Sequence, residues 1–137
     1  MYIPTAQLTL AGQWTPYVPT WTGSITDPVI GNGSILGAYL QVGQLVIAKA
    51  SIMMGSTTTF GLGNYNISLP VTEEISRGIS VGPGMALDSS LNQTFICHWR
   101  DAFVLINTSP VGLLAPTIPF IFAQDDQIQL TIIYKTT

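Results

Sequence analysis

Charged residues are scarce in this sequence. Only 8 % of the 137 residues are Asp, Glu, Lys or Arg, against about 25 % in ordinary soluble domains. The first 72 residues contain two charged side chains, Asp27 and Lys49. The four basic residues are not adjacent to one another. This spacing argues against a nucleic-acid partner, because such a partner requires clustered Lys and Arg.

Other features are also missing. No apolar run reaches the roughly 18 residues that a membrane-spanning helix needs, so no membrane partner is expected. The single cysteine, Cys97, excludes an intrachain disulfide. Residues 1–4 show neither the basic region nor the apolar region of a signal peptide. Disorder is not expected either, since 47 % of the residues are hydrophobic.

The residues that are present favour β-structure. Val, Ile and Thr together account for 40 of the 137 residues, and β-branched side chains fit a pleated strand better than a helix. The 13 Gly and 9 Pro are spread along the chain and interrupt any long helical window. Composition therefore predicts an all-β protein built from short strands.

Alternating patterns place about eight strands along the chain. We expect an antiparallel two-sheet sandwich, most consistent with a jelly roll of about eight strands, and the alternative is an up-and-down barrel. The Gly82-Pro83-Gly84 sequence predicts that one strand is interrupted by a bulge or a corner. Residues 1–19 contain three prolines and read as an extended N-terminal arm, whereas residues 20–137 form the sandwich domain. The predicted strands cover residues 20–25, 35–41, 45–54, 64–69, 78–88, 93–99, 102–107 and 127–135.

Two regions are candidates for contact with other subunits. In residues 45–54 one set of alternating side chains suits a core, but the other set, which includes Ile47 and Met53, is too apolar for a solvated face. The arm region contributes Trp14, Tyr17 and Trp21 as large anchors. These anchors pack either on their own domain or on a partner, and the sequence leaves both alternatives open.

The residues offer little chemistry. His98 is the only histidine, and it neighbours Cys97, but adjacent strand residues point to opposite faces and cannot form a nucleophile–base pair. One His and one Cys do not make a zinc site in one chain. Asp125-Asp126 reads as a solvated turn rather than a calcium site. We therefore expect no catalytic residue, no metal and no cofactor, and the chain reads as a structural or binding module rather than an enzyme.

Six segments of the chain match a known pattern in their order and spacing: residues 14–22 (WTPYVPTWT), 27–33 (DPVIGNG), 37–39 (GAY), 42–43 (VG), 55–61 (GSTTTFG) and 68–71 (SLPV). Together they resemble a small β-rich module of virion proteins in tailed bacteriophages, particularly those of actinobacteria. Such modules occur in minor tail or tail-fibre proteins and in head or tail decoration proteins. Ala38 departs from the pattern, which more often has a basic residue there.

The resemblance implies a structural protein on the outer surface of the virion, made in the bacterial cytoplasm. The leading expectation is a decoration protein that cements the capsid as a homo-oligomer, specifically a homotrimer, with the major capsid protein or tail proteins as partners. The alternative is a tail-fibre or receptor-binding knob that recognises a host surface glycan through the Thr-rich loop at residues 56–60. Capsid or tail location, the host and the assembly symmetry stay open.

Overall fold

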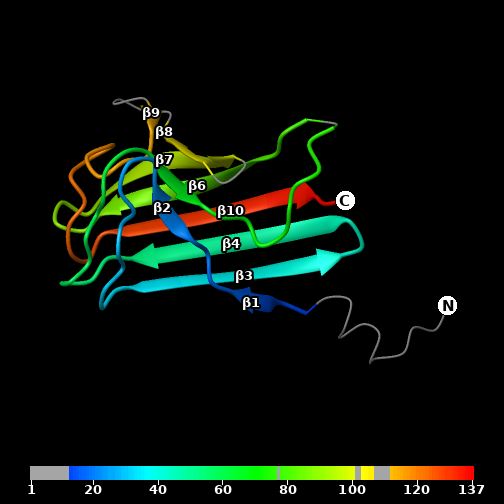
Figure 1. Cartoon of the computed structure of the whole chain (residues 1–137), viewed down its shortest axis with the longest axis horizontal. Helices are drawn as coiled ribbons and strands as arrows, with labels where there is room; N and C mark the ends of the chain where they lie inside the picture. The colour runs from blue at the N-terminus through cyan, green and yellow to red at the C-terminus, as the bar shows by residue number, and fades with distance from the viewer. Residues whose placement is uncertain (1–12, 77, 101–102, 107–111) are drawn as a thin grey trace.

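The structure is a computed structural model that describes residues 13–76, 78–100, 103–106 and 112–137. The regular elements in this part of the chain are all β-strands (Figure 1). The predicted all-β class is confirmed. The strands are β1 (Thr15–Tyr17), β2 (Trp21–Gly23), β3 (Ser34–Val42), β4 (Leu45–Met53), β5 (Tyr65–Ile67), β6 (Val81–Asp88), β7 (Gln93–Arg100), β8 (Phe103–Ile106), β9 (Gly112–Leu113) and β10 (Gln127–Lys135).

Paired strands are antiparallel and follow the order β1-β3-β4-β10-β6-β7-β8-β5-β2, with β9 beside β8. The strands β6, β7 and β8 lie next to one another, and β10 returns to lie beside β6. This arrangement is a Greek key, which is found in most β-sandwiches. It is not the sequential strand order of an up-and-down barrel.

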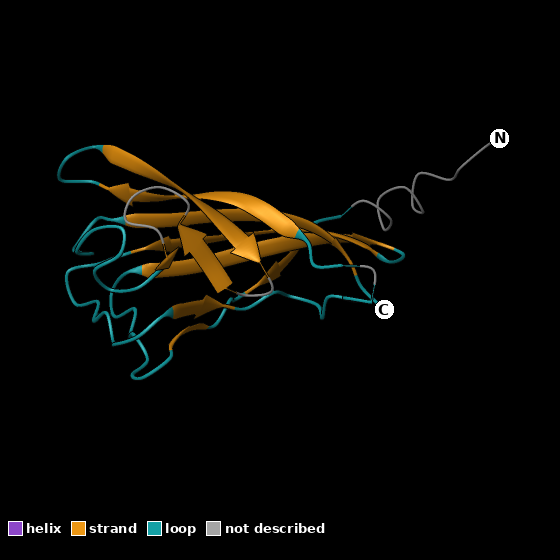
Figure 2. Ribbon diagram, turned by 90° about the horizontal axis from the view of Figure 1, so that it is seen from above, coloured by secondary structure: helices purple, strands orange, loops and turns teal. Residues whose placement is uncertain are grey.

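The short strands β2 and β5 form a second layer over one face of the long strands (Figures 1 and 2). They pair with each other, and β5 joins β8 through a single pair, Asn66 and Phe103. The indole Nε1 of Trp99 on β7 donates a hydrogen bond of 3.0 Å to the carbonyl oxygen of Ile67 on β5, which ties the two layers together. The predicted two-layer sandwich is confirmed.

The core fills the space between these layers. Three aromatic rings lie in a row inside it, those of Trp21, Tyr65 and Phe122. The ring centroids of Trp21 and Tyr65 are 5.0 Å apart, and those of Tyr65 and Phe122 are 6.2 Å apart. The long strands contribute the inward residues of their alternating patterns. From β4 and β10 these are Val46, Ala48, Ala50, Ile52, Ile128, Leu130, Ile132 and Tyr134.

The hairpin between β3 and β4 sets the register of the two longest neighbouring strands. Val42 pairs with Leu45, so the loop contains two residues, Gly43 and Gln44. Gly43 has φ 59°, and a two-residue loop with a left-handed residue first matches a type II′ turn, whose twist suits a hairpin.

Strand β6 runs without a break through Gly82, Pro83 and Gly84, so the predicted interruption is wrong. The glycines instead permit close packing, because a Cβ on Gly82 would lie 1.9 Å from the carbonyl oxygen of Thr131. The pairing of β6 with β10 ends at Gly84. Pro83 therefore lies beyond that ladder, where a missing amide hydrogen costs no bond to β10.

The predicted arm is divided. Residues 1–12 lie outside the described part of the chain. Thr15, Pro16 and Tyr17 form β1 and pair with β3 of the same chain, so this part of the arm packs on its own domain. Pro16 is accommodated because β1 is an edge strand, where a proline leaves no partner strand without a hydrogen bond.

Candidate assembly surface

The long strands turn one face away from the core, and we call this the outer face. Its residues alternate with the buried residues of the same strands, as strand geometry requires. The set consists of Leu36, Ala38, Leu40 and Val42 of β3; Leu45, Ile47, Lys49, Ser51 and Met53 of β4; Gln127, Gln129, Thr131, Ile133 and Lys135 of β10; Val81, Pro83, Met85 and Leu87 of β6; and Thr94, Ile96, His98 and Arg100 of β7.

The outer face is unusually apolar for a surface. Leu36 is 65 % exposed, Ile96 61 % and Ile133 59 %. An apolar row crosses three strands, since Leu40, Ile47 and Ile133 are aligned in register. Large contiguous apolar patches are rare on monomers and mark sites of interaction. The outer face is therefore the best candidate for a functional surface.

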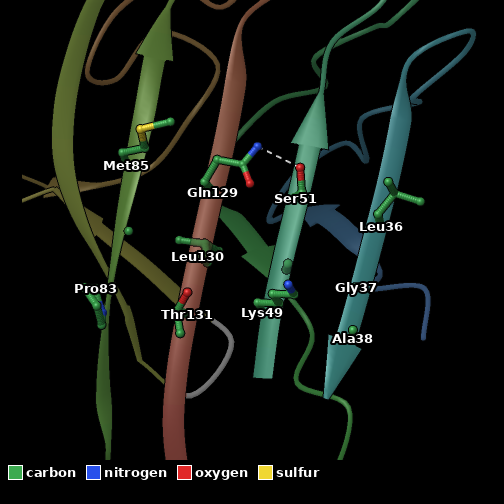
Figure 3. Close-up of a pocket in the computed structure, with 12 residues that line it drawn as sticks. Leu36, Gly37, Ala38, Lys49, Ser51, Pro83, Met85, Gln129, Leu130 and Thr131 are labelled. Carbon is green, nitrogen blue, oxygen red and sulfur yellow. Dashed lines mark hydrogen bonds between the residues drawn. The ribbon is translucent and has the colours of Figure 1, made fainter. Parts of the chain in front are cut away.

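A hollow of about 630 Å³ lies in the middle of this face (Figure 3). It extends across β3, β4, β10 and β6, and its walls combine apolar side chains with uncharged polar ones and one cation, Lys49. The amide of Gln129 donates a hydrogen bond of 2.7 Å to the hydroxyl oxygen of Ser51, which fixes two of the lining side chains. The outer-face side chains that line the hollow are Leu36, Ala38, Lys49, Ser51, Pro83, Met85, Gln129 and Thr131.

Charge on the outer face is sparse and positive. Lys49 lines the hollow, and its ammonium group lies 5.2 Å from the centre of the Trp14 ring. That spacing permits a cation–π contact, which gives the amine a partner inside its own chain. Lys135 pairs with Glu74 at 2.9 Å, and Arg100 lies at the end of β7. Between these three cations the face is mainly apolar, and apolar side chains predominate in the buried centre of an interface.

The five residues predicted to contact other subunits do not lie on one surface. Ile47 and Met53 lie on the outer face, and Met53 is 43 % exposed. Trp14 is exposed beside Lys49. These three residues remain available for contact with another subunit.

Tyr17 and Trp21 serve their own chain instead. The hydroxyl of Tyr17 donates a hydrogen bond to the carbonyl oxygen of Ser68, and its ring packs edge-on against Tyr39. Trp21 is 6 % exposed and belongs to the core. We correct the expectation for Trp21, because its indole points from β2 into the core and does not reach a partner's surface.

The pair Cys97 and His98 is arranged as strand alternation predicts. Cys97 is fully buried, whereas His98 lies on the outer face. Burial raises the pKa of the Cys97 thiol to about 12, which disfavours the thiolate that nucleophilic chemistry needs. The two side chains therefore do not act on a common substrate.

The side chain of Asp126 has a structural role. Asp126 is 2 % exposed and accepts hydrogen bonds from the backbone amides of Ser89 and Ala123. The expectation of a solvated turn is therefore wrong for Asp126, although Asp125 is exposed. Within the described ranges, no three His, Cys, Asp or Glu side chains gather in a group that could hold a metal ion.

The Thr-rich loop at residues 56–60 uses its polar groups internally. The hydroxyl oxygen of Thr57 accepts a hydrogen bond from the Asn32 amide, and that of Thr58 accepts one from the Gly55 amide. The Asn32 side chain bonds back to Thr57 and Ser56. The hydroxyls of Thr57 and Thr58 are thus already engaged, which weakens the interpretation of this loop as a sugar-binding site.

Most of the outer face was not predicted from the sequence. Ile133 stands among the polar residues of β10, so the alternation there gave no sign of an apolar patch. Leu36 lines the hollow, and Ile96 is paired with Met85, which also lines it. Pairing between strands places both residues there. The apolar second set in residues 45–54 was the one signal that did point to this face.

Comparisons with known proteins add no family to this picture. No family model, curated protein or solved structure matches the chain. A search for helices long and apolar enough to cross a membrane finds none among the described residues.

Proposed function

We propose that this chain is a structural protein of a tailed-bacteriophage virion that decorates or cements the capsid shell as a homo-oligomer, in the form of a trimer. The observation that carries the proposal is the broad, exposed outer face, on which apolar side chains far outnumber the three charged ones, Lys49, Lys135 and Arg100. Permanent interfaces contain few charged residues and resemble a domain core cut in half. The resemblance of residues 14–71 to virion modules supplies the phage setting.

The role we propose is not catalytic. Cys97 and His98 face opposite sides of β7, and the thiol is held protonated. A protein that works by contact requires a rigid scaffold and an adhesive surface, and the sandwich with its outer face provides both. The partners we propose are further copies of the chain and the major capsid protein, with tail proteins as the other virion location.

Purified protein added to virions that lack it tests this role. We expect it to bind the shell, to form oligomers in solution and to raise the temperature at which the particles release their DNA. A variant with Ile47→Glu on the outer face should fail to bind. The matched control is Ile25→Glu, because Ile25 is 76 % exposed in a loop after β2.

Two results would contradict the proposal. A protein that stays monomeric and leaves shell stability unchanged is not a cement. A protein that blocks adsorption of the phage to its host when added free is a receptor-binding knob, the alternative function, and a glycan array would then identify its ligand.

A further inference from the structure

The hollow on the outer face has the dimensions of a site for a short chain segment. Its volume of about 630 Å³ lies within the range of about 300–1,000 Å³ that is usual for ligand pockets. A whole domain face would not fit into it, but a few side chains would. Its lining is neutral apart from Lys49, whose ammonium group is directed to the Trp14 ring.

The sequence contains a segment that suits this hollow. Residues 1–12 carry no charged side chain, and within them Ala6, Leu8 and Leu10 alternate with Thr5, Gln7 and Thr9. An extended segment with this pattern presents an apolar side and an uncharged polar side. The polar side matches the hydroxyl and amide groups that the hollow also offers, such as those of Ser51 and Gln129.

The described chain starts beside the hollow but leads away from it. β1 pairs with β3 so that Tyr17 lies opposite Gly37 and Thr15 opposite Tyr39. Toward the N-terminus the chain therefore approaches the Val42 end of β3, whereas the hollow lies at Leu36 and Ala38. A segment that leaves the subunit in this direction would have to reverse its course to enter its own hollow, and twelve extended residues span up to about 40 Å.

We propose that residues 5–10 of one copy occupy the hollow of a neighbouring copy, with Ala6, Leu8 and Leu10 directed into it. This inference rests on the proposed function, since it assumes that the chain forms homo-oligomers. Such a contact joins two different surfaces of the subunit. Head-to-tail contacts of this kind form a ring when the rotation between subunits closes, and a ring of three copies is the trimer proposed above.

A cross-linking experiment on the full chain tests the contact. Leu8→Cys is combined with Ser51→Cys in the hollow, and the protein is oxidised and analysed on a non-reducing gel. Cys97 is left in place because it is fully buried. We expect disulfides between chains, which give bands of two and three linked subunits. The matched control combines Leu8→Cys with Thr94→Cys, which lies on the outer face outside the hollow, and we expect at least tenfold less linkage.

Other results overturn the inference. A disulfide within one chain shows that each subunit fills its own hollow, and equal linkage in the control shows that the segment has no fixed site. If the protein is oligomeric and binds shells but Leu8 and Ser51 do not link, this contact is wrong and the proposed function stands. If the protein is monomeric and does not bind shells, the proposed function itself fails.

A second pair of variants checks the same contact without cysteines. Leu8→Asp should weaken association at least tenfold, measured by sedimentation velocity, because it places a charge in an apolar site. Thr9→Asp, on the opposite side of the alternating segment, should have little effect. Equal behaviour of the two variants contradicts the proposed orientation of the segment.

Discussion

A charged side chain at position 47, in place of Ile47, should weaken assembly more than it destabilises the folded subunit. Ile47 lies on the outer face, half-buried, between Leu40 of β3 and Ile133 of β10. Complete burial of an isoleucine is worth about 1.5–3 kcal/mol, so Ile47→Glu should cost the isolated subunit about 1 kcal/mol. That loss corresponds to a decrease of about 4 °C in Tm for a chain of this size.

The cost to association should be larger. A carboxylate that loses water in an apolar interface without a partner costs about 3 kcal/mol. Each 1.4 kcal/mol is tenfold in affinity, so the dissociation constant should rise by roughly a hundredfold. The same substitution at Ile25, which is 76 % exposed and away from the outer face, should change neither quantity.

The dependence of Tm on protein concentration distinguishes the loss of association from the loss of folding stability. Association makes Tm rise with protein concentration, so we expect that dependence in the natural protein and in Ile25→Glu but not in Ile47→Glu. Sedimentation equilibrium measures the dissociation constants, and circular dichroism measures Tm. If Ile47→Glu associates as tightly as Ile25→Glu, the outer face is not the interface, and the low charge of the chain needs another cause.

Three further predictions follow from the interior and the edges of the fold. Trp21→Ala should destabilise the subunit by about 3–5 kcal/mol in urea unfolding, because it removes a buried indole. Asp126→Ala should cost about 1–3 kcal/mol in the same assay, since it removes the carboxylate that accepts hydrogen bonds from the backbone amides of Ser89 and Ala123. Hydrogen bonds from Ser76 and the ion pair with Lys135 lower the pKa of Glu74 to about 2. A lowered folded-state pKa stabilises the fold above the unfolded value and is lost as pH falls, so the Tm of Glu74→Gln should decline less than that of the natural protein between about pH 4.5 and 2.

The long strands could be predicted because each has one buried face, which gives its sequence an alternating apolar pattern. β10 has the bounds that its alternation gave, and β4 differs by one residue. The short elements were harder. β1 contains Pro16, which argues against a central strand, but an edge strand tolerates it. β9 has two residues, too few for any pattern.

The candidate surface could be predicted only where one strand carried it. Ile47 and Met53 were visible in the alternation of β4, and their outward direction is confirmed. The hollow, however, combines side chains from β3, β4, β10 and β6, whose residues are up to 95 positions apart in sequence, from Leu36 to Thr131. Register between distant strands creates it, and no single segment specifies that register. The prediction for Trp21 was wrong for a similar reason. Only the pairing of β2 with β5 in the second layer shows that its indole faces the core.

Comparison of β4 with β10 shows that the apolar outer face is not a requirement of the fold. The two strands pair along their whole length, with Met53 opposite Gln127 and Leu45 opposite Lys135. The same face of the same sheet therefore holds long polar side chains at positions adjacent to the apolar ones. Packing within the subunit does not explain Leu45, Ile47 and Met53, which contribute little to the core from the solvent side. The contact with other subunits that we propose would explain them, and the aligned row of Leu40, Ile47 and Ile133 marks where that contact should be sought first.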